Sequence, residues 1–188
     1  DRFLYQVQGG LKTIRYFKVF NRWGVEAHVS GPVSDQLKAR LAISQEGGGG
    51  WQKSYTRDDK LGRRDRTLGR FLLEWDPVET IKLNMGLNAW RDRSEAQALQ
   101  LIRYAPLQPP GLPQVASYPL APRNARAADW DPKLQYSGND KKFEYASWFM
   151  HPSLRIDADL TDDVKLTSLS TYSRYSTDSL IDVDGTAY

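Results

Sequence analysis

The sequence contains no cysteine, and this absence excludes both a disulfide framework and a thiolate metal site. It also lacks any apolar run that approaches the roughly 20 residues of a transmembrane helix. No Gly-x-Ser-x-Gly elbow is present, so we predict no catalytic residue and no enzyme activity. His28 and His151 are the only histidines, and they fall on polar registers of different predicted strands. Nothing in the sequence assigns further ligands beside them, so no metal and no cofactor is predicted.

Basic and acidic residues are also nearly balanced in number. The 26 basic and 23 acidic residues leave a net charge of +3, and the basic residues are scattered, which argues against a nucleic-acid partner. Hydrophobic residues make up 40% of the chain, slightly few for a globular core, whereas aromatic residues reach 12%. The chain begins at Asp1 without a start methionine or a secretory signal, so we expect a mature chain or a piece of a longer one.

The clearest pattern that the sequence does contain is a strand–turn–strand unit over residues 66–90, with its turn at residues 76–80. Side chains alternate between two faces in both arms, although Leu68 and Leu72 interrupt the polar face of the first arm. The residues that share the other face are Thr67, Gly69, Phe71, Leu73 and Trp75 in the first arm, and Ile81, Leu83, Met85, Leu87 and Ala89 in the second. A soluble sandwich strand usually has about five or six residues, and a strand that crosses a bilayer needs roughly 9–11. Length and alternation together favour a transmembrane hairpin with a lipid face and a polar lumen face.

Two further hairpins show this alternation, although it is weaker in the last strand. Their arms and turns are residues 23–30, 31–36 and 37–44, and residues 148–160, 161–163 and 164–175. Pro152 lies on the apolar register of its strand, which predicts a bulge or an irregular start there. Arg155 shares its face with Asp157 and Asp159, which predicts a salt-bridged polar lining rather than a pair of catalytic carboxylates.

The connections between these arms alternate strictly in length. The short ones are residues 31–36, 76–80 and 161–163, and the long ones are residues 47–65 and 91–144. In a meander, all the short turns then lie on one rim and all the long loops on the other, as in outer-membrane barrels. We therefore predict an all-β fold: an antiparallel transmembrane β-barrel segment of about six to eight strands.

Several runs resemble the TonB-dependent outer-membrane receptors. Residues 29–42 are similar to the early barrel strands of that family, and residues 51–59 to the loop that follows them. Asp131, residues 166–173 and residues 182–188 continue the similarity in the same order. The resemblance covers about residues 21–188. Residues 1–20 do not follow it and form an uncertain N-terminal segment whose apolar and aromatic residues cannot be assigned a face, although Gly9 and Gly10 could turn a hairpin.

The resemblance implies a larger barrel of about 22 strands, plugged by a separate domain. It further implies uptake of a scarce nutrient, such as a ferric siderophore, across the outer membrane of a Gram-negative cell. The expected partners are outer-membrane lipid, the TonB complex through a plug domain that is absent from this chain, and a small-molecule ligand such as an iron chelate.

The candidate ligand-binding residues are aromatic and cationic side chains of the two long loops. They are Trp51, Tyr55, Arg57, Arg103, Tyr104 and Trp130. Aromatic rings and arginines together can hold a planar anion by stacking and charge-assisted hydrogen bonds. The same residues could instead pack the loops. Aromatic residues near the strand ends, which include Trp75, Trp90 and Trp148, are expected to form an interfacial girdle, and Asp182 and Asp184 to be loop acids rather than calcium ligands.

Two alternatives remain open at the level of the sequence. One is a complete small outer-membrane barrel with a structural or adhesive role, which requires residues 1–20 to supply one hairpin. The other is a soluble β-sandwich or lipocalin-like ligand-binding module, because such folds also use long alternating strands.

Overall fold

The structure is a computed structural model that describes residues 3–9, 12–19, 21–103, 118–133 and 143–188. The chain separates into two compact units. The sheet unit comprises Asp1–Gly47, Arg66–Asp92 and Ser147–Thr177, and the loop unit comprises Gly48–Asp65, Arg93–Ala146 and Asp178–Tyr188.

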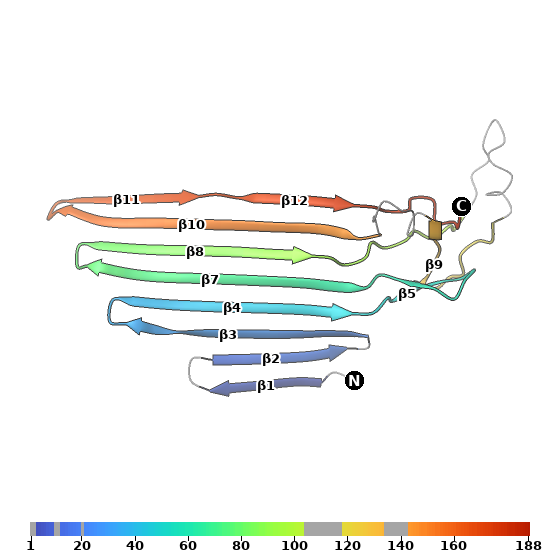
Figure 1. Cartoon of the computed structure of the whole chain (residues 1–188), viewed down its shortest axis with the longest axis horizontal. Coiled ribbons are helices and arrows are strands. Elements are labelled where there is room, and N and C mark those ends of the chain that lie inside the picture. Colours follow the sequence, from blue (N-terminus) through green and yellow to red (C-terminus); the bar gives the residue numbers. More distant parts are fainter. Residues whose placement is uncertain (1–2, 10–11, 20, 104–117, 134–142) are drawn as a thin grey trace, which may run out of the picture. The chain divides into compact units, whose positions relative to one another are not determined.

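The sheet unit is an antiparallel meander, and its strands follow the order β1-β2-β3-β4-β7-β8-β10-β11, with β12 also paired to β10 (Figure 1). The strands are β1 (Phe3–Gly9), β2 (Lys12–Val19), β3 (Arg22–Ser34), β4 (Leu37–Gly48), β7 (Arg64–Val78), β8 (Ile81–Asp92), β10 (Tyr145–Thr161), β11 (Val164–Thr171) and β12 (Arg174–Ser179). The predicted all-β meander is confirmed. Over the described residues the path of paired strands has two ends, so the sheet is open rather than closed into a barrel.

The hairpin turns are tighter than predicted, because the strands run further than the alternation suggested. Only residues 35–36, 79–80 and 162–163 separate the arms of the three hairpins. Asp76 and Pro77, predicted to lie in a turn, fall inside β7, where the register shifts between Trp75 and Val78. A two-residue turn matches the twist of its flanking strands, and a local irregularity in the ladder takes up the extra residues.

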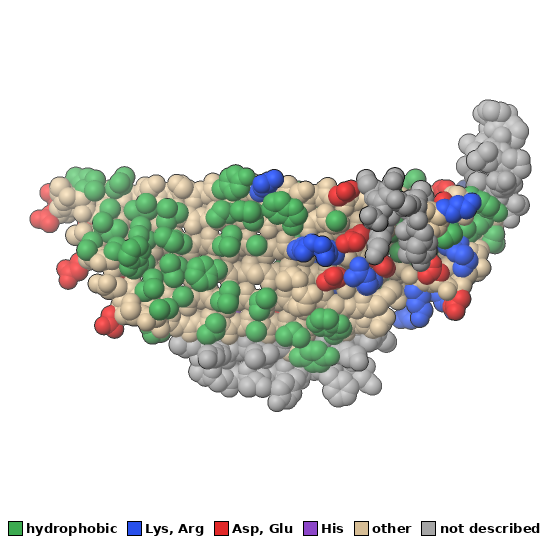
Figure 2. Space-filling view, viewed as in Figure 1, with side chains coloured by type: hydrophobic (Ala, Val, Ile, Leu, Met, Phe, Trp, Pro, Cys, Tyr) green, Lys and Arg blue, Asp and Glu red, His purple; other side chains and the backbone are tan. Residues whose placement is uncertain are grey.

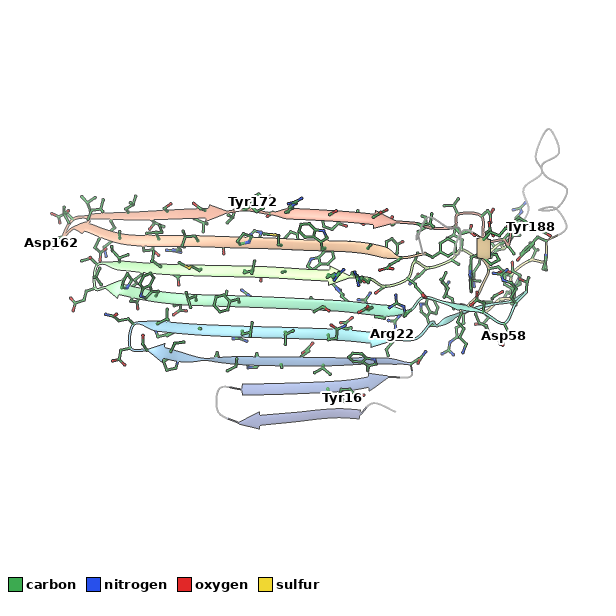
Figure 3. All side chains as sticks on the ribbon, viewed as in Figure 1. Tyr16, Arg22, Asp58, Asp162, Tyr172 and Tyr188 are labelled. Carbon is green, nitrogen blue, oxygen red and sulfur yellow. The ribbon has the colours of Figure 1, made fainter. Side chains whose placement is uncertain are left out.

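The sorting of short and long connections is confirmed for the three predicted hairpins, whereas the short connection from β2 to β3 lies at the end of the long connections. The short turns β3–β4, β7–β8 and β10–β11 all lie at the same end of the sheet (Figure 1). Asp162 marks that end in Figure 3, and Arg22, at the start of β3, lies at the opposite end. The long connections of the chain join strands at this second end.

The pairing also confirms which residues share a face, since directly opposite residues of an antiparallel pair point to the same side. Phe71 pairs with Leu87, which pairs with Pro152. Leu73, Met85 and Leu154 form the next such row. The apolar registers predicted for three separate strands therefore coincide on one side of the sheet.

Pro152 leaves the pairing of β10 with β8 regular but interrupts the strand on the other side of β10. Its pairing with Leu87 lies within a regular register, so the predicted bulge is not found between β10 and β8. On the other side, the Pro152 carbonyl accepts a hydrogen bond from the Tyr172 N–H at 3.1 Å. Proline has no N–H with which to return a bond. The ladder is interrupted there, and the predicted last strand is divided into β11 and β12.

The N-terminal residues form a hairpin of β1 and β2, and β2 pairs with β3. A hairpin in this segment was a requirement of the small-barrel alternative. In the β2–β3 register, Lys12 is opposite Val29 and Lys18 is opposite Trp23. Lysines thus occupy the two outer positions of β2 that match the apolar register of β3, and Ile14 and Tyr16 occupy the two positions between them.

The loop unit holds the buried core. Its small sheet has the order β6-β5-β9, from β5 (Gln52–Ser54), β6 (Lys60–Leu61) and β9 (Ala127–Ala128), with β9 parallel to β5. The core residues are Leu61, Ala96, Ala98, Ala128, Trp130 and Phe143, with Leu180 packed against them. The segments predicted as long loops are therefore folded together where the structure describes them.

Candidate functional site

One face of the sheet carries an uninterrupted apolar surface, which we call the apolar band. It consists of Gly69, Phe71, Leu73 and Trp75 on β7, Leu83, Met85, Leu87 and Ala89 on β8, and Met150, Pro152, Leu154 and Ile156 on β10. None of these residues is charged, and Met85 in the middle is 37% exposed. The face seen in Figure 2 shows apolar side chains along the strands, with acidic side chains at the hairpin turns. The sheet unit itself consists of a single layer of strands and adds no second layer over this band.

Tryptophans mark both ends of the apolar band. Trp75 lies in its last row, and Trp148 lies in the row of Thr67 and Arg91, just beyond its other end. The distance along β7 from Thr67 to Trp75 corresponds to about 27 Å at roughly 3.4 Å per residue. An outer-membrane barrel has an apolar belt about 25 Å tall between two aromatic girdles.

Trp90 differs from these two tryptophans, because its partners Leu68 and Phe149 place it on the opposite, polar face. Its ring stacks on Phe149 at 6.2 Å between centroids and lies 5.9 Å from the ring of Tyr175. The Arg66 guanidinium lies 5.7 Å from its centroid. Trp90 therefore belongs to an aromatic cluster on the polar face and not to a girdle on the apolar one.

The polar face contains a hollow of about 470 Å³ over β3, β4, β7 and β8, which we call the polar hollow. The side chains that give it chemical character are Glu26, His28, Arg40, Arg70, Asn88 and Trp90. Small residues such as Ala42 and Ser44 leave the space between them. This hollow was not predicted from the sequence. The feature that could have indicated it is the presence of two small residues, Ala42 and Ser44, on the polar register of β4.

The rest of the polar face is lined by ion pairs, as predicted. Arg155 donates two hydrogen bonds to Asp157, at 2.7 and 2.9 Å, and Thr167 donates a third at 2.7 Å. Lys165 lies 3.2 Å from Asp159. These carboxylates are held by cations in an exposed setting, which gives them a structural role.

In the loop unit, a fully buried carboxylate, Asp129, ties together several chain segments. It accepts hydrogen bonds from the hydroxyl of Ser54 at 3.1 Å and from the backbone N–H of Trp130 at 3.0 Å, and also from the hydroxyls of Thr56 and Tyr118. The Arg57 guanidinium lies 2.9 Å from Oδ1 of Asp129, the oxygen that also accepts from Ser54 and Trp130. We call these five side chains, Asp129, Ser54, Thr56, Arg57 and Tyr118, the Asp129 cluster. Burial and the hydrogen bond to Asp129 raise the pKa of Tyr118 to about 12.

Two of the candidate ligand-binding residues, Arg57 and Trp130, pack against each other in the loop unit. Trp130 is 0% exposed, and the Arg57 guanidinium lies 5.5 Å from its ring and donates to its carbonyl oxygen at 2.6 Å. Tyr55 donates its hydroxyl hydrogen to the Pro119 carbonyl at 3.0 Å and contacts the Tyr118 ring edge-on. These contacts pack the loop unit.

Of the remaining candidates, the structure describes Trp51 and Arg103. Trp51 packs against Gly62, where a Cβ atom would lie 2.6 Å from the indole ring. Arg103 is exposed, and Tyr104 lies outside the described residues. The ligand-binding role of the six residues stays a prediction.

Acidic residues near the C-terminus fix the segment around them by accepting backbone hydrogen bonds. Asp182 is buried and accepts hydrogen bonds from the N–H groups of Asp131, at 2.6 Å, and Asp184, at 3.1 Å. Burial raises the pKa of the Asp182 carboxyl. Gly185 adopts a φ of 68°, and a Cβ there would lie 3.0 Å from the Leu99 carbonyl. The segment is thus anchored to two distant parts of the loop unit.

Within the described part of the chain, no three or more His, Cys, Asp or Glu side chains gather in a way that could hold a metal ion. No helix in the same residues has the length and apolarity to cross a membrane. Comparisons with protein-family models, with curated proteins and with solved structures give no match.

Proposed function

We propose that this chain is part of the wall of a transmembrane β-barrel in a Gram-negative outer membrane, from a receptor that resembles the TonB-dependent family. The observation that carries the proposal is the apolar band. The hairpin β7–β8 and the strand β10, which is distant in sequence, place apolar residues in matching rows, without a charge, on one side of an open sheet.

The energetics of exposure support a lipid partner for this face. Burying a Leu, Phe or Met side chain is worth about 1.5–3 kcal/mol relative to leaving it in water. The exposed apolar residues of the band, including Phe71, Met85 and Leu87, gain this only if something covers them. Acyl chains cover such a face without requiring a complementary surface, and the tryptophans at the two ends fit the membrane–water interfaces.

The transport role rests on the resemblance and on the opposite character of the two faces. With the apolar band toward lipid, the ion pairs and the polar hollow line the interior of the barrel. The wall then provides a polar path, and energised uptake of a nutrient such as an iron chelate requires the plug and the TonB complex. No step of this role is catalytic.

The absence of cysteine makes a direct test simple. A single cysteine replaces Leu87 in one variant and its neighbour Asn88 in a matched control, and each is labelled with an environment-sensitive fluorophore after refolding in lipid vesicles. The label at residue 87 is expected to emit at shorter wavelength and to be quenched by brominated lipid, because that side faces acyl chains. The label at residue 88 should be quenched by iodide instead.

Both labels responding equally to the two quenchers, in samples with full β-sheet circular dichroism, would contradict the proposal. Such a result would favour a soluble sheet covered by protein.

A further inference from the structure

The polar hollow combines two cations with a flat aromatic wall. Arg40 on β4 and Arg70 on β7 both line it, and both are exposed. Trp90 and Leu68 supply an apolar side. The acidic side chain that lines the hollow is Glu26, so arginines outnumber carboxylates around it.

The register between β4 and β7 brings the two arginines close to each other. Lys38 contacts Glu74 at 3.8 Å, and Thr67 donates a hydrogen bond to Gln45. Both contacts fit a single register in which Ala42 is opposite Arg70, so Arg40 and Arg70 are diagonal neighbours, about 7–8 Å apart. Two guanidinium groups so placed can share one anion through charge-assisted hydrogen bonds.

The small residues beside the arginines leave room for such an anion. Ala42 and Ser44 line the hollow, and its volume of about 470 Å³ suits a small organic molecule. Arginine binds a carboxylate through two parallel hydrogen bonds, and an indole ring stacks on a flat ring.

From these features we propose that the polar hollow binds an aromatic carboxylate, with its carboxylate oxygens on Arg40 and Arg70 and its ring against Trp90. The proposal rests on the proposed function, because a sheet folded in lipid presents this face to water. This proposal assigns a chemical class of ligand to the barrel wall. The residues that would bind it differ from the six candidate ligand-binding residues of the loops.

Isophthalate, a flat ring with two carboxylates, is a suitable probe because it is water-soluble and stays out of lipid. Isothermal titration calorimetry on the chain refolded in nanodiscs should give saturable binding at one site. Isophthalamide has the same shape without the charge, and it should bind at least tenfold more weakly, since it loses the charge-assisted hydrogen bonds. Glutarate, a flexible dicarboxylate, should bind with intermediate affinity.

Variants locate the site. Arg40→Gln and Arg70→Gln should each weaken isophthalate binding about tenfold, because each removes one charged partner. Arg70→Lys keeps the charge but loses the two-pronged geometry, and its effect should be smaller. Trp90→Leu should weaken isophthalate but leave glutarate unchanged. The matched control is Lys38→Gln, which removes a cation from the same strand and face outside the hollow.

The proposal is overturned by absence of saturable isophthalate binding, or by a loss in Lys38→Gln equal to that in Arg70→Gln. The labelled cysteines at residues 87 and 88 are read in the same nanodiscs. A lipid-facing label without isophthalate binding rejects this proposal alone, whereas labels that contradict a lipid face reject the proposed function.

Discussion

At the scale of single residues, the most consequential side chain is Asp129. It is a fully buried carboxylate, and Arg57 is the one cation among the side chains of the Asp129 cluster. Removing one partner of a buried charge pair costs about 3–5 kcal/mol, mostly by leaving the other charge uncompensated. Asp129→Asn should therefore destabilise the loop unit by this order. Urea unfolding, followed by the near-ultraviolet circular dichroism of the buried Trp130, measures the loss.

Asp58→Asn serves as the control, since Asp58 is 97% exposed in its side chain and lies 3.8 Å from Lys53. Exposed pairs of this kind contribute about 0–1 kcal/mol. Equal losses in the two variants would show that the Asp129 cluster does not hold the loop unit together.

The phenol of Tyr118 gives the loop unit a dependence on alkaline pH. Its pKa is about 12 in the folded chain and 10.0 for an unperturbed tyrosine. The unfolded chain therefore loses this proton first as pH rises, and the folded state loses stability between pH 10 and about 12. The contribution is complete below pH 10. Urea midpoints at pH 9 and pH 11 measure it.

Tyr118→Phe should flatten this part of the pH dependence, because phenylalanine has no proton to lose. An unchanged difference between the two pH values in the variant would contradict the role given to Tyr118.

At the scale of elements, the strands differ on their two faces. Met85→Arg puts a charge in the middle of the apolar band, whereas Asn84→Arg adds the same charge to the polar face. We expect a loss of roughly 2–4 kcal/mol for arginine at the bilayer midplane and a much smaller effect at residue 84. Leu41→Arg on β4 should resemble Met85→Arg. The fraction of folded chain in vesicles, measured by heat-modifiable gel mobility, would contradict the assigned faces if all three variants assembled equally.

The break between β11 and β12 has a cause that can be removed. Pro152→Ala restores an N–H opposite Tyr172, so the two short strands should join and gain about 0.5–1.5 kcal/mol from the new hydrogen bond. Hydrogen exchange of residues 171–174 should slow. Unchanged exchange would show that the interruption arises from the sequence of β11 and β12 themselves.

The strands and their faces could be predicted because period-two alternation is a local property of the sequence. The register did not follow from it, because a shift of two residues keeps every side chain on its face; the row of Leu73, Met85 and Leu154 came from the pairing in the structure. The turns were placed less well, because Asp76 and Pro77 resemble turn residues wherever they occur. The Asp129 cluster could not be predicted, since its contacts join Thr56 to Asp129 across a long sequence separation that no local pattern encodes.

The polar hollow was missed for a related reason. Arg40 and Arg70 belong to different strands, and only the register between β4 and β7 makes them neighbours. Aromatic residues were assigned to a girdle by their position near strand ends; Trp75 lies on the face that its register predicted. Trp90 required its pairing partners before its face was known.

At the scale of the whole molecule, the chain contains one unit with a core and one without. All the buried hydrophobic residues of the described chain, such as Trp130, Phe143 and Leu61, belong to the loop unit. The sheet unit has long strands with two uncovered faces. Lipid or detergent should therefore be required for the sheet and not for the loop core.

This difference leads to a prediction for the purified chain. Dilution from urea into buffer should give weak β-sheet circular dichroism, and addition of detergent micelles should increase it strongly, because the apolar band is then covered. A monomer with full β-sheet signal in detergent-free buffer, by sedimentation velocity, would contradict a lipid-facing role for the band.

The anchoring of the C-terminal residues also bears on the timing of folding. Neighbouring strands of the meander are neighbours in sequence, so the hairpins can form one after another as the chain is made. The loop unit instead needs Asp182 against Asp131 and Gly185 against Leu99. Residues 182–185 thus complete a structure begun near Gly48, and a chain that has not yet been synthesised up to them carries its loops unassembled and exposed to proteases.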